Sequence, residues 1–220
     1  MTTTGPRGSG PVVLVGGLRA TDLTMRPLRD RLRELGYTVT TFTTGAGMGC
    51  SAHTVAQLRK VVRAADDGTG VLLVGHSRGG QFARALAQDP DLPVRALVTL
   101  GTPFDPYGVS RWLLVQVAAI AVAGTLGVPG LVRLSCAFGA CCAAFRATLR
   151  GAVAVPFTAV HSKQDRLVRW RSCVDDLADN VEVACGHLDL VAHPAPLRAV
   201  ARALARATTG AAPIGPSRGG

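Results

Sequence analysis

The sequence has few of the features that mark nucleic-acid-binding proteins. Of its 24 basic residues only Lys60 and Lys163 are lysines, and the arginines never form a run of four or more. Aromatic residues, which could stack on bases, make up 5% of the chain. The formal net charge of +10 therefore predicts weak attraction to anionic surfaces. We expect no nucleic-acid partner.

Patterns typical of metal sites and of secretion are also missing. The six cysteines show no pair-of-pairs spacing, and no nearby histidines complete a zinc site. The opening segment, MTTTGPRGSGPVVLVGG, lacks the charged and then apolar profile of a signal peptide. We therefore expect no zinc site, a cytoplasmic location and mostly reduced thiols. The sequence does not decide whether a disulfide forms among Cys136, Cys141 and Cys142.

The composition predicts one folded domain with loose ends. Charged residues make up 17% and hydrophobic residues 48%, which excludes disorder across the whole chain. Segments 1–10 and 208–220 are rich in Gly, Pro, Ser and Thr and are predicted to be flexible. Residues 11–207 are long enough for one domain with a full core.

Apolar strand-like runs alternate with segments of helical spacing along this domain. The strands are predicted at 11–17, 37–42, 71–75, 94–100, 156–162 and 180–185. The helices are predicted around Leu28, Leu32 and Leu35, around Val55, Leu58 and Val62, around Phe82 and Leu86, and around Leu197, Val200 and Leu204. This alternation predicts an α/β fold with a mostly parallel, doubly wound sheet and helices on both faces.

One segment, about 104–155, breaks this rhythm and contains no convincing strand. Its stretch from Trp112 to Val132 carries no charge, a length that would suit a membrane span. Glycines and Pro129 interrupt that stretch and leave too short an apolar run. We expect an apolar helical lid inserted between two strands. An ordinary buried helix and a true membrane span remain the alternatives.

The stretch VLLVGHSRGGQFARALA, residues 71–87, predicts a catalytic serine. An apolar strand turns sharply into a helix, and Ser77 stands at the turn between Gly75 and Gly79. Such a turn presents a serine hydroxyl at the carboxyl edge of a sheet, where small neighbours let the backbone pass closely. Ser77 is therefore predicted to be a nucleophile. A purely structural turn serine is the alternative.

A serine nucleophile needs a base and an acid that orients the base. His187 and Asp165 each follow a predicted strand, and the order Ser77, Asp165, His187 suits this architecture. Three other carboxylates, on a predicted helix or its exit, compete for the role of acid: Asp175, Asp176 and Asp179. The other histidines are predicted to have a structural role or to lie at the surface: His53, His76, His161 and His193.

The oxyanion of an acyl-transfer reaction needs backbone donors. One is predicted to be the N–H of Arg78, the residue after the nucleophile. The second is predicted to be the N–H of Leu18, which follows Gly16 and Gly17 in the loop after the first strand. The alternative is that these two glycines only turn the chain.

With these residues in place, the chain resembles the α/β-hydrolases, specifically the lipase/esterase-like branch, over about 12–207. The motifs are VLVGG, GHSRGG, LVTLGTPFDP, HSKQD and GHLDL, and the C-terminal part is similar to small actinobacterial triacylglycerol-lipase-like hydrolases. The resemblance implies a Ser-His-Asp triad, no metal and no cofactor. Many relatives carry His-Gly where this chain has Gly16-Gly17, which leaves the geometry of that donor open. The chain is also short, so the amino-terminal strands of larger members are expected to be missing.

The expected function is hydrolysis of a carboxylic ester through an acyl-enzyme. The apolar segment 104–155 favours a small-molecule or lipid-like substrate with an apolar acyl or alcohol part, and allows transient contact with a membrane surface. A thioesterase, amidase or acyltransferase with the same triad is the nearest alternative. A non-catalytic binding protein of the same fold and a membrane-attached protein are the others.

Overall fold

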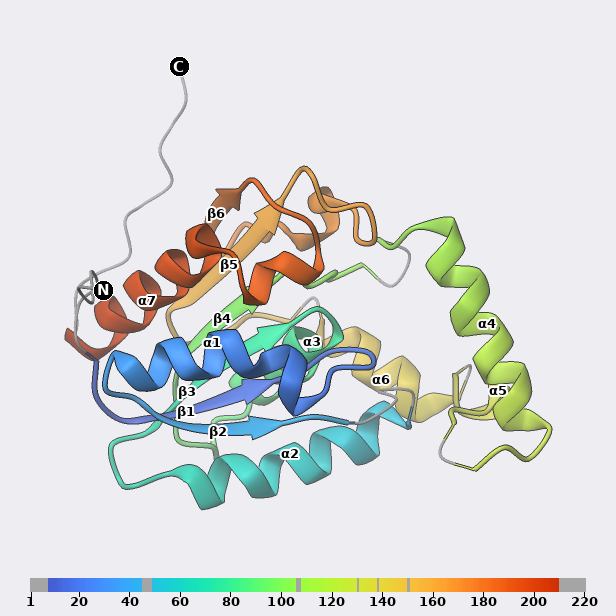
Figure 1. Ribbon diagram of the computed structural model, residues 1–220. Coiled ribbons are helices and arrows are strands. Elements are labelled where there is room, and N and C mark those ends of the chain that lie inside the picture. The colour runs from blue at the N-terminus through green and yellow to red at the C-terminus, as the bar shows by residue number, and fades with distance from the viewer. Residues whose placement is uncertain are drawn as a thin grey trace.

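The computed structural model describes residues 8–44, 49–105, 108–129, 131–137, 139–149 and 151–209 (Figure 1). Six strands form one sheet in the order β2-β1-β3-β4-β5-β6, and each neighbouring pair is parallel. The strands are β1 (Pro11–Val15), β2 (Thr38–Phe42), β3 (Val71–His76), β4 (Val94–Leu100), β5 (Phe157–Ser162) and β6 (Asp179–Val183). The predicted parallel α/β sheet is confirmed.

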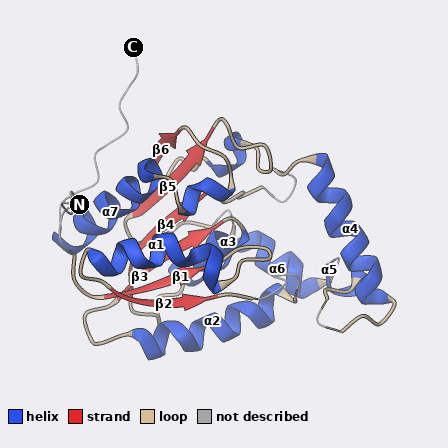
Figure 2. Cartoon of the chain, viewed as in Figure 1, coloured by secondary structure: helices blue, strands red, loops and turns tan. Residues whose placement is uncertain are grey.

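Helices cover both faces of this sheet (Figure 2). They are α1 (Asp22–Glu34), α2 (Ser51–Ala65), α3 (Arg78–Ala87), α4 (Arg111–Thr125), α5 (Leu134–Ala137), α6 (Ala140–Thr148) and α7 (Pro194–Thr209). Two short 3₁₀ helices, η1 (Trp170–Cys173) and η2 (Leu188–Val191), lie in the loops near β6.

The apolar runs of the central strands are explained by two separate cores. Successive side chains of a strand point to opposite faces, so a strand that is covered twice must be apolar throughout. On one face Leu14 and Val74 pack in the core that α1 and α7 complete. On the other face Val15 and Leu73 pack in the core that α2 and α3 complete. All five residues of β1 are buried.

The strand order places a crevice where the functional residues are predicted. The chain passes from β1 outward to β2 and then returns to form β3 on the other side of β1. In a doubly wound sheet such a reversal opens a crevice at the carboxyl ends of the two strands. The loop of Gly16 and Gly17 follows β1, and Ser77 follows β3. Both segments therefore lie at the edge where ligands bind in such folds.

The segment between β4 and β5 leaves the sheet at this same edge. Its described residues form α4, α5 and α6 and no strand; Val109 makes only an isolated antiparallel bridge to Val168. Figure 1 shows α4 and α5 beyond the arrowheads of the central strands. None of the helices in the described ranges is long and apolar enough to cross a membrane.

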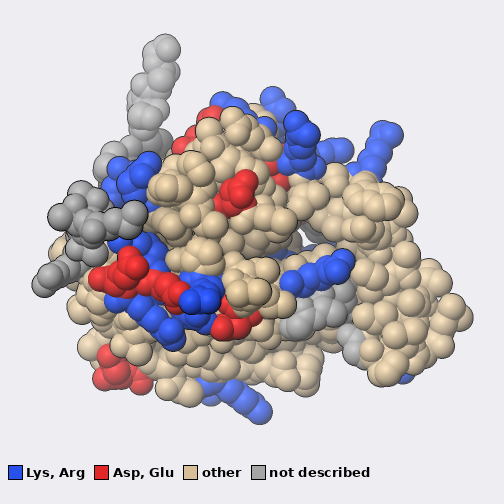
Figure 3. Space-filling model, in the orientation of Figure 1, with Lys and Arg blue, Asp and Glu red and all other residues tan. Residues whose placement is uncertain are grey.

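The charged side chains are unevenly distributed. In Figure 3 the coloured side chains gather over the body of the domain, while the part formed by α4 is almost uniformly uncharged. Several large apolar side chains of this segment are exposed, among them Trp112 at 67% and Leu126 at 81%. This surface therefore combines low charge with an unusual exposure of apolar groups.

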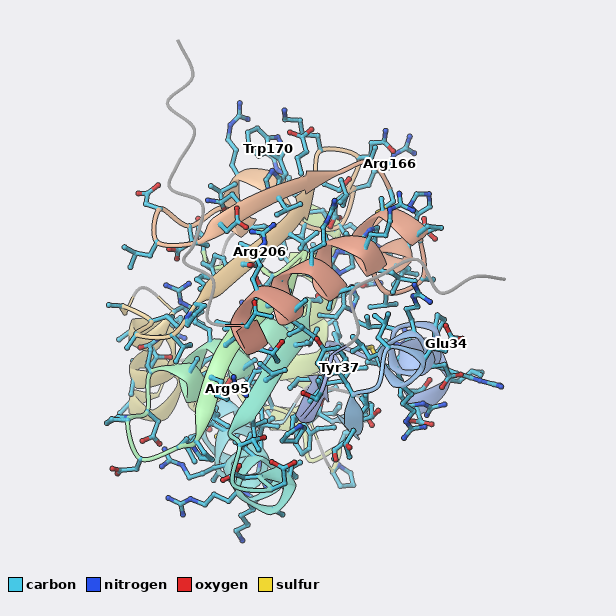
Figure 4. All side chains as sticks on the ribbon, turned by 90° about the vertical axis from the view of Figure 1, so that its left-hand side faces the viewer. Glu34, Tyr37, Arg95, Arg166, Trp170 and Arg206 are labelled. Carbon is cyan, nitrogen blue, oxygen red and sulfur yellow. The ribbon has the colours of Figure 1, made fainter. Side chains whose placement is uncertain are left out.

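At the end of the molecule away from α4, two arginines connect α7 to the sheet (Figure 4). Arg206 of α7 donates to Asp179 of β6 at 2.9 Å, and Arg95 of β4 donates to the carbonyl oxygen of Ala207 at 3.3 Å. These contacts fix the last helix against the sheet.

The ends of some elements differ from the prediction. Two glycines turn the chain, so β1 ends at Val15 and not at residue 17. The backbone N–H of Gly8 donates to the carbonyl oxygen of Leu35, so residues 8–10 of the expected flexible end are packed against the domain. At the other end α7 continues to Thr209. The remainders of both expected tails, 1–7 and 210–220, lie outside the described residues.

Candidate active site

Ser77 occupies a strained turn between β3 and α3. Its φ is 54° and its ψ is −128°, a backbone conformation that residues other than glycine seldom adopt. Ser77 is the N-cap of α3, yet its side chain makes no capping hydrogen bond. Its N–H donates to the carbonyl oxygen of Leu100 at 2.8 Å, which ties the turn to β4. The hydroxyl is thus not used by its own helix.

The glycines around this turn allow close contacts between backbones. A Cβ on Gly79 would lie 2.3 Å from the carbonyl oxygen of Val15, and a Cβ on Gly75 would lie 2.4 Å from the Cα of Gly80. A Cβ on Gly17 would lie 2.8 Å from the Cβ of Ser77. The loop after β1 therefore packs directly against the serine turn, and a larger side chain at these positions would separate the two.

Asp165 and His187 are brought together by the loops after β5 and β6. Oδ2 of Asp165 lies 2.6 Å from Nδ1 of His187, and the two side chains are 2% and 7% exposed. The backbone N–H groups of Leu167 and Val168 both donate to Oδ1 of Asp165 at 2.8 Å. The carboxylate is therefore held on both oxygens and fixes the orientation of the imidazole.

The surroundings of Asp165 favour its ionised form. Burial alone would raise the pKa of this carboxyl group, but the hydrogen bond from His187 and those from the backbone N–H groups act in the opposite direction. The net effect is a pKa below the ordinary value for aspartate. An ionised acceptor requires the proton of His187 to be on Nδ1, which leaves Nε2 as the acceptor of a neutral ring.

His187 lies beside the serine turn. The Nε2–H group of His76, the residue before Ser77, donates to the carbonyl oxygen of His187 at 3.0 Å. The two imidazole rings lie 4.8 Å apart between centroids. On the β4 side, Nδ1 of His187 lies 3.2 Å from the position of a Cβ built on Gly101. The predicted nucleophile and base therefore belong to neighbouring, mutually contacting segments.

His76 is a buried neutral histidine. Burial, followed by the positive charge that His187 can carry, lowers the pKa of His76 from 6.5 to about 3. Its single described hydrogen bond joins the turn to the segment of the base. This contact supports the structural role predicted for it.

The other predicted acids have different partners. Asp175 lies 2.6 Å from Nη1 of the buried Arg84, Asp179 pairs with Arg206, and Asp176 is exposed. The helix expected around them is a 3₁₀ turn that ends at Cys173, and Asp179 is the first residue of β6. The structure thus brings only Asp165, of these four carboxylates, to His187.

The remaining histidines lie in other surroundings. His161 of β5 is buried and stacks on Trp170, with ring centroids 5.8 Å apart. Nδ1 of His193 accepts from the N–H of Ala195 near the start of α7. His53 is exposed on α2. None of the three has a described contact with Ser77 or Asp165.

A pocket of about 270 Å³ adjoins Ser77, close to the lower end of typical small-molecule sites. Leu18, Ser77 and Arg78 line it from the sheet edge. Most of the opposite wall consists of apolar side chains of the segment between β4 and β5, including Leu113, Leu114, Val117, Phe145 and Leu149. Both residues predicted to supply oxyanion donors therefore reach the same pocket as the nucleophile.

No disulfide bond joins Cys136 to Cys142. Sγ of Cys136 lies 3.7 Å from Sγ of Cys142, well beyond the length of a disulfide bond. The side chain of Cys141 lies outside the described part of the chain. Among the described residues, no group of three or more His, Cys, Asp and Glu side chains could hold a metal ion.

Sequence reasoning missed the side chain of Arg78. The prediction used only its backbone N–H, but the guanidinium of this pocket-lining residue also donates to Ser51 of α2 at 3.1 Å. No spacing in the sequence could reveal this contact, because it depends on how α2 and α3 pack.

Comparison with known families settles the relationship of the chain. The family model of palmitoyl protein thioesterases matches residues 11–124, just over half of the sequence. The chain belongs to the palmitoyl protein thioesterase family. The resemblance to α/β-hydrolases is thereby confirmed at the level of the superfamily. No curated protein matches the chain by sequence.

Solved structures agree with the fold of this thioesterase family member. An extracellular α/β-hydrolase from a Paenibacillus species is 15% identical, with a TM-score of 0.62 over 90% of this chain and 99% of that chain. The thioesterase domain from the curacin biosynthetic pathway is 17% identical, with a TM-score of 0.57 over 96% and 93%. A metagenome-derived lipolytic enzyme is 18% identical, with a TM-score of 0.61 over 90% and 94%. At these identities the similarity establishes the α/β-hydrolase fold.

Proposed function

We propose that this α/β-hydrolase is a serine hydrolase that cleaves carboxylic esters through Ser77, His187 and Asp165. One observation carries the proposal. The imidazole of His187 is held by a 2.6 Å hydrogen bond to a buried carboxylate, in a segment that contacts the strained turn of Ser77. A strained serine and an oriented histidine are what activation of a hydroxyl group requires.

The proposed reaction has two steps. In the first, Ser77 Oγ attacks the ester carbonyl carbon while His187 takes the hydroxyl proton and passes it to the leaving alcohol. The backbone N–H groups of Leu18 and Arg78 bind the oxyanion, each contributing about 3 kcal/mol to the transition state. In the second step, water gives a proton to His187 and attacks the acyl-enzyme carbonyl carbon; the bond to Ser77 Oγ then breaks, His187 returns the proton to Oγ, and the acid leaves. Asp165 stays ionised and stabilises the imidazolium.

The substrate is proposed to have an apolar part. The wall built by α4 and α6 offers apolar contacts next to Ser77, which suits an acyl chain or an apolar alcohol. We further propose that α4 acts as a lid and touches lipid surfaces transiently. The exposed side chains of Trp112 in α4 and of Leu126 at its C-cap, together with the net charge of +10, support contact with an anionic surface. A cytoplasmic location remains a prediction.

The decisive experiment replaces the nucleophile. Ser77→Ala should abolish hydrolysis of p-nitrophenyl esters without changing the far-UV circular dichroism spectrum. A fluorophosphonate probe should label the wild-type protein and not the variant. Turnover that persists at the wild-type rate in Ser77→Ala would refute the proposal.

Thioester hydrolysis is the second candidate. The family match and the thioesterase domain among the similar structures favour it, because the acyl-enzyme is the same and only the leaving group differs. Parallel measurements with a p-nitrophenyl ester and a thioester of the same acyl length distinguish the two. A higher kcat/KM for the thioester would assign the protein to thioesterases.

A further inference from the structure

The pocket beside Ser77 contains a buried cation. Nε of Arg78 is fully buried and has no hydrogen-bond partner among the described residues. The guanidinium lies over the ring of Phe82, 5.4 Å from its centroid, and Arg78 is one of the residues that line the pocket together with Ser77. A buried N–H group without an acceptor is costly, so its persistence calls for an explanation.

The described neighbours of Arg78 are neutral or weakly polar. Nη2 donates to the hydroxyl group of Ser51, and three nearby cysteines, Cys50, Cys136 and Cys142, interact with the guanidinium electrostatically. Within the described ranges, no carboxylate lies at ion-pair distance from Arg78. Burial lowers the pKa of Arg78, as expected for a cation in apolar surroundings.

Arg84 is a second buried arginine of α3, and it has an ion-pair partner within the chain. It is buried six residues further along α3, and its Nη1 lies 2.6 Å from Asp175. Nε of Arg84 is also buried without a hydrogen-bond partner, so the difference between the two arginines lies elsewhere. Arg84 has a carboxylate of the chain as its counter-ion, whereas Arg78 has none in the described ranges and lines a pocket. The side chains that line this pocket include a second arginine, Arg146, and no acidic residue.

We propose that Arg78 binds a carboxylate of the substrate, so that the preferred ester carries an anionic group besides its apolar part. This inference rests on the proposed ester hydrolysis at Ser77. The planar guanidinium of an arginine matches the two oxygens of a carboxylate. A monoanion suits a small apolar pocket better than a phosphate dianion, because less charge is removed from water.

The test compares two substrates that differ only in charge. Mono-4-nitrophenyl adipate has a free carboxylate at the far end of its acyl chain, and its methyl ester has none. The readout is the ratio of their kcat/KM values, from which any general loss of catalysis cancels. Arg78→Met should lower this ratio by about ten- to a hundredfold, the range expected for a lost charge-assisted hydrogen bond. A ratio that stays within twofold of the wild type would overturn the inference.

Two further variants keep the result interpretable. Arg202→Met removes the same charge from an exposed position on α7 and should leave the ratio within twofold of the wild type. A tenfold fall in that control would mean that net charge, and not Arg78, sets the preference. Arg78→Gln keeps a donor for Ser51 while removing the charge, and serves the same comparison if the methionine variant does not fold.

A binding experiment separates this inference from the proposed function. Monomethyl adipate should bind Ser77→Ala in isothermal titration calorimetry and bind about tenfold or more weakly to the Ser77→Ala/Arg78→Met double variant. Equal affinities would overturn the role of Arg78 whatever the enzyme hydrolyses. Tighter binding of monohexyl phosphate than of monomethyl adipate would overturn the choice of carboxylate. If monomethyl adipate binds as expected but the wild-type protein hydrolyses no ester, only the proposed function would be rejected.

Discussion

His76 makes the stability of this protein depend on pH. Its ring is buried, its Nε2–H group donates to the carbonyl oxygen of His187, and its pKa falls from 6.5 to about 3 on folding. Between these two values the unfolded chain binds a proton that the folded protein does not bind. Acidification therefore favours the unfolded state. His76→Gln removes this titration while keeping an N–H donor in a similar position.

The size of this effect on stability follows from how far the pH lies below the pKa of His76 in the unfolded chain. Each pH unit below 6.5 costs about 1.36 kcal/mol for a group that is protonated only when unfolded. The ordinary pKa of 6.5 lies about 1.5 units above pH 5. Protonation of His76 in the unfolded chain should therefore lower the free energy of unfolding of the wild type by about 2 kcal/mol at pH 5 relative to pH 7.5. For a domain of this size that corresponds to roughly 4–8 °C in Tm.

Urea unfolding followed by circular dichroism at pH 7.5 and pH 5 measures this cost. The loss of unfolding free energy between the two pH values should be about 2 kcal/mol smaller in His76→Gln than in the wild type. A lower overall stability of the variant does not affect this difference. His53→Gln, at an exposed histidine of α2, should behave as the wild type does. Equal pH dependence in His76→Gln and the wild type would refute the reasoning.

Two other features give further predictions. Asp175→Asn leaves the cation of Arg84, which is 1% exposed, without its counter-ion and should cost about 3–5 kcal/mol in urea unfolding. The double variant Arg84→Met/Asp175→Asn should recover much of that loss, and a double variant as unstable as the single one would contradict this account. Leu126→Gln, at the exposed C-cap of α4, should weaken flotation with anionic vesicles, while Leu177→Gln, also exposed, should not. Equal flotation of the two variants would argue against contact through α4.

The parallel sheet could be predicted because its signals are local. The run VLLV in β3 is apolar throughout since both faces of the strand are covered, and the sequence alone shows this. The glycines after β1 and β3 are also visible in the sequence, and they permit the close approach of Gly79 to the carbonyl oxygen of Val15. Even the proximity of Asp165 and His187 follows from topology, because the loops after β5 and β6 meet at the carboxyl edge of the sheet.

What could not be predicted depends on packing between distant segments. Arg84 and Asp175 are far apart in the sequence, and no periodicity connects them. The orientation of the Arg78 side chain is set by Ser51 and Phe82, on two different helices. The expected helix near Asp175 is only a short 3₁₀ turn, because the chain there must reach β6 within a few residues. These features are specified by three-dimensional contacts and not by local pattern.

The same contacts explain how the strained turn of Ser77 persists. A backbone with φ of 54° costs free energy at a residue other than glycine, and it survives only where neighbouring elements leave no alternative. Here the N–H of Ser77 is bound to β4, Gly79 lies against β1, and His76 is bound to the segment of His187. Three elements thus hold the turn in place independently of any substrate. It follows that Ser77 and the segment of His187 are arranged before a ligand arrives, which the proposed stabilisation of an oxyanion would require.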